Sequence, residues 1–132
     1  MAHVDVIFWR AINGEVPVES WLLELDRHHP AAFLKCRRAL ETLRERGHEL
    51  KRPDVENLNG GLYELRVKLG HVNFRFLYCF HARTSAVVLV ALTKEAQIPE
   101  TELRRARERK ELFEHDPRTH SYVSPLLPEA LP

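Results

Sequence analysis

Charged or polar side chains stand at alternate positions in two neighbouring stretches of the sequence, with Glu64, Arg66 and Lys68 in 62–68 and Asn73 and Arg75 in 72–80. If both stretches are antiparallel strands, these side chains share one face of a hairpin. Arginine and lysine stay positively charged at neutral pH and donate hydrogen bonds to phosphate oxygens. The pattern therefore predicts a phosphate or nucleic-acid site. Its residues are Glu64, Arg66, Lys68, His71, Asn73, Arg75 and Thr93, with Lys94 at the end of a third strand.

Three consecutive strands must position these side chains. The stretches LYELRVK, VNFRFLYCF and AVVLVALTK alternate in the way that half-buried strands require. With Leu69 and Gly70 as a two-residue turn, the expected cross-strand pairs are Glu64 with Arg75, Arg66 with Asn73, and Lys68 with His71. The charged face would stay open. The other face would pack on the core and contain Tyr63, Leu65, Val67, Phe74, Phe76, Tyr78, Phe80, Val88, Val90 and Leu92.

The rest of the chain predicts a strand, a helical hairpin and a last helix around this sheet. Residues 3–9 alternate as a strand, and helical spacing follows Pro17 and again Pro30, up to Gly47. Residues 47–61 are predicted to be a loop, and Pro99 begins the last helix. We expect an α+β fold in the order β-α-α-β-β-β-α, with one domain at 1–115 and an extended, Pro-containing tail at 116–132.

Composition favours a single globular domain. A chain of 132 residues, 44% hydrophobic, can bury a core without metal or disulfides. Its longest apolar run is too short for a membrane helix, and the stretch MAHVDVIFWR has no basic leader, so we expect a cytoplasmic protein with no membrane partner. Cys36 and Cys79 fit positions of small buried hydrophobes.

The charge distribution limits how much of the surface could bind RNA. The net charge is only +1, although positive residues concentrate in the middle of the chain. The helix after Pro99 alternates arginines with glutamates, which favours a solvated, ion-paired face. The eight histidines lack the spacing of a zinc site, and no Gly-rich phosphate loop is present. We expect neither a metal nor a cofactor.

Four stretches in this order resemble the phage-derived branch of the HigB/RelE toxin family, namely KRPDVENLNGGLYELRV, VNFRFLYCF, LTKEAQIPETEL and ERKELFEHDPRTHSY. The resemblance extends from the first helix to Tyr122. It implies the same β-α-α-β-β-β-α order and the toxin of a type II toxin–antitoxin pair. Many such toxins are ribosome-dependent endoribonucleases that cut mRNA. The implied partners are the ribosome with its mRNA and a cognate antitoxin, often a helix-turn-helix protein.

This activity needs a ribose 2′-hydroxyl to attack the adjacent phosphate, with cations over the phosphate and groups that move protons. In the resemblance, Arg66 and Arg75 match basic catalytic positions, although Arg75 could simply pair with Glu64. Lys94 is a candidate phosphate contact or proton carrier, and His71 is a candidate general acid or base. Alternatively, Lys94 is an ordinary lysine at a strand end and His71 a solvated histidine in a turn. The candidate RNA-binding residues are Lys68, Lys51 and Arg52.

Several positions depart from the pattern of ribosome-dependent relatives. Glu95 stands where many relatives carry a basic residue, and Glu64 stands where some carry a lysine. Thr101 lies near the position of a tyrosine found in the last helix of some members. Two other functions therefore stay open: a ParE-like toxin that binds DNA gyrase, and a non-catalytic remnant that only binds an antitoxin. His120 and Tyr122 could reach the sheet only if the tail folds back. Tyr78 should point into the core.

Overall fold

The computed structural model of the protein describes residues 3–93 and 96–128. The predicted order of one strand, two helices, three strands and a helix is present, and two short strands, β2 and β6, are added to it. The fold class, mixed α+β, is confirmed. In chain order the elements are β1 (Asp5–Trp9), α1 (Pro17–His28), α2 (Pro30–Arg46), the 3-10 helix η1 (Gly47–Glu49), β2 (Val55–Asn57), β3 (Tyr63–Leu69), β4 (Val72–His81), β5 (Ser85–Thr93), α3 (Glu100–His115) and β6 (Ser121–Tyr122).

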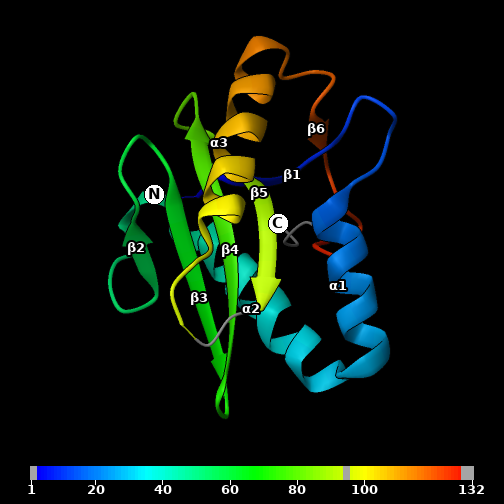
Figure 1. Cartoon of the computed structure of the whole chain (residues 1–132), viewed down its shortest axis with the longest axis vertical. Coiled ribbons are helices and arrows are strands. Elements are labelled where there is room, and N and C mark those ends of the chain that lie inside the picture. Colours follow the sequence, from blue (N-terminus) through cyan, green and yellow to red (C-terminus); the bar gives the residue numbers. More distant parts are fainter. Residues whose placement is uncertain (1–2, 94–95, 129–132) are drawn as a thin grey trace.

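One twisted sheet runs through the molecule in the order β2-β3-β4-β5-β1-β6. Strand β1 is parallel to β5, and the other neighbouring pairs are antiparallel. Figure 1 shows α3 crossing in front of β4 and β5, while α2 lies behind the sheet. The sheet therefore has a helix on each face.

The helical hairpin owes its sharp corner to His29 and Pro30. The backbone N–H of His29 donates to the carbonyl of Leu25 and closes α1, and its Nδ1 accepts from the N–H of Ala32 and caps α2. Pro30 suits the first turn of α2 because its missing N–H would have no helical partner there. No described helix combines the length and the apolar character that crossing a membrane would demand.

The first core cluster lies between the helical hairpin and the sheet, on the face that we predicted to be apolar. Leu22 of α1 and Cys36, Leu40 and Leu43 of α2 are buried there. Seven predicted hairpin residues and Val88 belong to this cluster or pack against it. Tyr78 is 1% exposed, which confirms that it points into the core.

A second core cluster fills the opposite face, under α3, and the prediction of an open face is wrong over β4 and β5. Ala106 and Phe113 of α3 pack there with Leu77 and Leu89. A register shift in the β4–β5 ladder pairs Leu77 with Val90 but Tyr78 with Val88. Leu89 is the extra residue of β5, and the side chains that follow it point to the opposite faces from those expected. Val90 and Leu92 consequently lie in the second cluster, contrary to the prediction.

The β3–β4 register also differs from the prediction, by two residues. The turn is Gly70-His71, and Leu69 pairs with Val72. Gly70 has φ +62°, a conformation that glycine adopts readily but that Leu69 would have had to adopt in the predicted turn. Because the shift is an even number of residues, every side chain keeps its predicted face. The cross-strand partners change to Arg66 with Arg75 and Lys68 with Asn73.

Two segments contain structure that we did not predict. The expected loop at 47–61 contains η1 and β2, and β2 pairs with the beginning of β3. The expected extended tail folds back instead, and β6 pairs with β1 through Phe8–Tyr122 and Trp9–Ser121. Buried apolar surface stabilises the fold here, because Leu127 reaches the first core cluster.

Candidate functional site

The predicted charged face centres on a buried carboxylate. Glu64 is 1% exposed, and each of its oxygens accepts a hydrogen bond from an arginine. The donors are Arg66 Nε at 2.7 Å and Arg75 Nη1 at 2.6 Å. The ion pair between Arg75 and Glu64, which we considered as an alternative to catalysis, is therefore present. It forms diagonally across the two strands.

This arrangement holds two like charges beside each other. Arg66 and Arg75 are direct cross-strand partners, a placement that repels unless an anion intervenes. Glu64 supplies one negative charge for two positive ones, so the triad keeps a net positive charge. The Arg66 side chain is 45% exposed, whereas that of Arg75 is 14% exposed. Arg66 is thus the arginine that can meet a ligand directly.

The charges continue onto β2. Glu56 is the cross-strand partner of Glu64 and accepts two hydrogen bonds from Arg52, at 2.5 and 2.6 Å. These bonds, with the charges of Arg52 and Arg66, hold the pKa of the Glu56 carboxyl below its usual value. Arg52, predicted to bind RNA, is therefore engaged by a neighbouring carboxylate.

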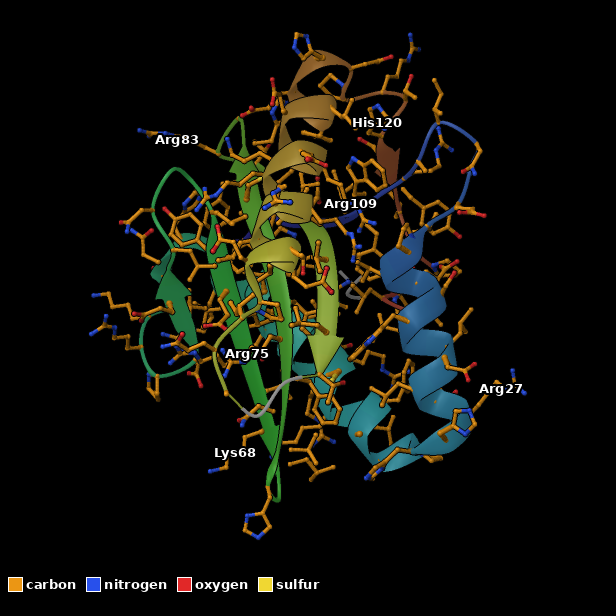
Figure 2. The ribbon with its side chains drawn as sticks, in the orientation of Figure 1. Arg27, Lys68, Arg75, Arg83, Arg109 and His120 are labelled. Atoms are coloured by element: carbon orange, nitrogen blue, oxygen red, sulfur yellow. The ribbon has the colours of Figure 1, made fainter. Side chains whose placement is uncertain are left out.

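A groove of about 870 Å³ opens beside this cluster, between α2 and the edge of β3. Strand β2 pairs with β3 at Tyr63–Leu65, and the N–H of Arg66 still donates to the carbonyl of Asp54 at 2.8 Å, so β3 loses its β2 partner only beyond Arg66. The groove brings Arg66 and Lys68 together with Lys35 and Arg38 of α2. Figure 2 shows Lys68 nearer than Arg75 to the tip of the β3–β4 hairpin.

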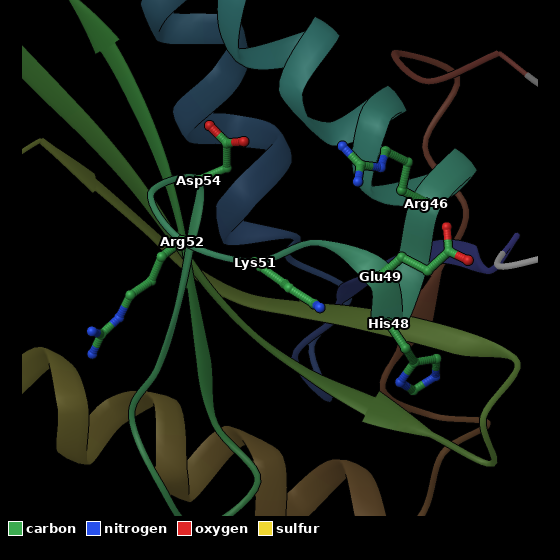
Figure 3. A pocket seen from close by; sticks show the side chains of 6 residues that line it. All are labelled: Arg46, His48, Glu49, Lys51, Arg52 and Asp54. Atoms are coloured by element: carbon green, nitrogen blue, oxygen red, sulfur yellow. The ribbon is translucent and has the colours of Figure 1, made fainter.

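A second hollow, of about 540 Å³, lies where η1 meets the following loop (Figure 3). Its lining includes Lys51 and Arg52, which we predicted to bind RNA, and Asp54 lines both hollows. In Figure 3 Lys51 points towards His48 and Glu49, whereas Arg52 points away from them. The two hollows together place seven lysines and arginines along α2, the loop and β3, namely Lys35, Arg38, Arg46, Lys51, Arg52, Arg66 and Lys68.

The remaining predicted site residues lie elsewhere. His71 is exposed in the turn of the hairpin and does not line the groove. Lys94 and Glu95 fall outside the described residues. Within the described residues, no group of three His, Cys, Asp or Glu side chains could hold a metal ion.

His120 and Arg109 have structural contacts far from the charged triad. The His120 ring stacks on Trp9 with 5.4 Å between centroids, and its Nδ1 lies 2.7 Å from the carbonyl of Arg10. Arg109 lies 4.8 Å from the Trp9 ring centre and donates to the carbonyl of Leu89 at 2.8 Å. Figure 2 shows both residues near the end of the molecule where β6 lies. The contacts of His120 hold the segment at β6 against β1, and those of Arg109 hold α3 against the sheet.

Sequence reasoning missed the contribution of α2. Lys35 and Arg38 of this helix were not assigned to the site. Their signal was present, since Ala31, Lys35, Arg38 and Thr42 recur at the spacing of one helical face. Only the packing of α2 beside β3 shows that this face meets the charged hairpin.

Residues 20–111 match the family model described as phage derived protein Gp49-like (DUF891). This span is more than half of the chain and contains the charged triad and the groove. The chain belongs to the Gp49-like family. A comparison with curated proteins gave no match.

Proposed function

We propose that this Gp49-like protein is the toxin of a type II toxin–antitoxin pair and acts as a HigB-like, ribosome-dependent endoribonuclease. Two lines of support come from its family, which is a family of RelE-like toxins, and from the resemblance of its motifs to HigB. The observation that carries the proposal is the net positive triad of Arg66, Glu64 and Arg75, with the half-exposed Arg66 facing a basic groove.

In the proposed reaction a ribose 2′-oxygen forms a bond to the adjacent phosphorus as the bond to the 5′-oxygen breaks. Negative charge grows on the phosphate oxygens, and a fixed guanidinium stabilises it. Arg66 would contact the phosphate. Arg75, which is bonded to Glu64, would add positive charge nearby. Lys94 and His71 are our candidates for proton transfer, and Lys68, Lys51 and Arg52 for contacts with the RNA backbone.

Induction in cells, followed by mapping of RNA 5′ ends, tests this function. We expect growth arrest and new cuts within translated mRNA, and we expect both to vanish in the Arg66→Ala, Arg75→Ala double variant. Arg104→Ala, Arg118→Ala is the matched control, since both side chains are exposed and distant in sequence from the triad. Persistent cuts in the double variant would contradict the assignment of the arginines.

One observation favours a second candidate, a toxin or remnant that binds a partner without cleaving RNA. Arg75 is mostly covered and already bonded to Glu64, as expected of a structural ion pair. Growth arrest without RNA cuts would support a ParE-like protein that binds gyrase. Normal growth with a well-folded protein would support a remnant that binds only an antitoxin.

A further inference from the structure

The groove between α2 and β3 has an aliphatic floor as well as a basic rim. Leu34 of α2 is 48% exposed there. Apolar and basic residues both line the groove along three turns of α2. The aliphatic lining residues are Ala31, Leu34, Ala39, Pro53 and Val67, and the basic ones are Lys35, Arg38, Arg66 and Lys68.

The rim cations have charge to offer a ligand. Lys35, Arg38 and Lys68 are exposed and take part in none of the salt bridges found among the described residues. Among the described residues, Asp54 is the single acidic one that lines the groove. The groove therefore attracts an anionic ligand.

The uncharged lining residues distinguish between two anionic ligands, single-stranded RNA and an acidic peptide. Sites for single-stranded RNA typically combine contacts with phosphates and aromatic rings on which the bases stack. The described lining includes no Phe, Tyr or Trp. Aliphatic side chains beside basic ones instead match a peptide that presents apolar residues on one side and carboxylates on the other. The lining therefore favours an acidic peptide over RNA.

We propose that this groove binds an acidic, amphipathic segment of a protein partner. From Ala31 to Thr42 the groove extends along α2 for roughly 17 Å, which corresponds to a helix of about eleven residues. Apolar side chains of the segment cover Leu34, and its carboxylates pair with Lys35 and Arg38. The proposal rests on the proposed function in one respect, because it identifies the partner as the antitoxin.

Such a segment also explains how a partner could inhibit the site. Arg66 and Lys68 line the same groove, so bound carboxylates would occupy the cations that contact phosphate in the proposed reaction. The partner need not distort the sheet, because competition for these two side chains suffices.

Fluorescence anisotropy with the purified full chain tests the proposal. The probe is a labelled synthetic peptide in which leucines recur at helical spacing and glutamates fill the other positions. The comparison probes are the same peptide with glutamines for glutamates, and a labelled oligouridylate. Ribosomes are absent, so the result does not depend on whether the protein cleaves RNA.

We expect the acidic peptide to bind, and Lys35→Glu, Arg38→Glu to weaken this binding roughly tenfold or more. Arg104→Glu, Arg118→Glu gives the same net charge from exposed positions outside the groove and should leave binding unchanged. Leu34→Gln should weaken binding without a change of charge. Circular dichroism checks that each variant is folded.

Three results would overturn the proposal. Equal binding of the glutamine peptide would remove the role of charge. Equal weakening by both double variants would show an effect of net charge alone. Oligouridylate that binds while the acidic peptide does not, with binding lost in the groove variant, would assign the groove to RNA instead.

Discussion

Glu64 determines the geometry of both candidate arginines, and its removal should be costly. In Glu64→Ala, Arg75 becomes a largely buried cation without its carboxylate. Breaking a buried ion pair in this way costs about 3 kcal/mol of unfolding free energy. Urea denaturation measures the loss.

Glu45→Ala is the control, because Glu45 is exposed on α2 and forms none of the salt bridges seen in the described residues. We expect its unfolding free energy to change by less than about 0.5 kcal/mol. Similar values for the two variants would show that the triad does not stabilise the fold.

The two cysteines give a prediction about pH. Burial raises the pKa of the Cys36 and Cys79 thiols from 9.0 to about 12. The folded protein therefore keeps these protons at a pH where the unfolded chain has lost them. Their contribution to stability is complete below pH 9 and is lost as the pH rises towards 12.

Urea unfolding at about pH 8 and about pH 10 tests this linkage. We expect the wild type to lose more unfolding free energy between the two than Cys36→Ala, Cys79→Ala does. Burial of Tyr78 raises the pKa of its phenol as well, but that residue is present in both proteins and cancels in the comparison. An identical loss in the two proteins would refute the effect.

Alternation of residue types allowed the faces of Glu64, Arg66 and Arg75 to be predicted, because parity depends only on strand periodicity. The partners could not be predicted in the same way. The cross-strand partners depend on which residue adopts positive φ in the turn. The sequence alone allows Gly70 at either of the two turn positions. The diagonal bonds to Glu64 follow from the actual register.

Helix α3 stabilises the sheet through few residues. Phe113 is 1% exposed in the second core cluster, whereas its neighbour Leu112 is 48% exposed. Phe113→Ala should lower the unfolding free energy by about 3–4 kcal/mol because it leaves a cavity between α3 and the sheet. Leu112→Ala should have little effect. Equal losses would mean that α3 is packed differently.

The segment that follows α3 should stabilise the fold in the same manner. Leu127 is 6% exposed and Val123 is 69% exposed. Leu127→Ala should cost about 2 kcal/mol in urea unfolding, and Val123→Ala about zero. A neutral Leu127→Ala would indicate that this segment behaves as the extended tail expected from its prolines.

Long, periodic elements could be predicted from the sequence and short ones could not. The helices and β3, β4 and β5 have strong periodicity, but β2 and β6 contain three and two residues. Elements of this size exist because a neighbouring strand pairs with them. The shift at Leu89 likewise leaves no mark in an uninterrupted apolar stretch, AVVLVAL, which suits either face.

At the scale of the whole molecule, helices cover both faces of the sheet, and the groove beside the β3–β4 hairpin gathers four cations, Lys35, Arg38, Arg66 and Lys68. On α3 the predicted ion pairing is present at two positions, where Arg105 pairs with Glu102 and Lys110 with Glu114. The net charge of +1 is therefore compatible with one local basic site. Its extension onto α2 depends on tertiary packing and was not predictable from local pattern.

Cleavage of mRNA in purified, mRNA-programmed ribosomes tests the central claim most directly. Primer extension reports the cut positions and their rates for wild type, Arg66→Ala and the control Arg104→Ala. We expect wild type and control to cut the mRNA only when it is bound to the ribosome, and Arg66→Ala to cut about a hundredfold more slowly. Intact mRNA with folded wild-type protein, or equal rates for Arg66→Ala and wild type, would contradict the proposed nuclease and its site.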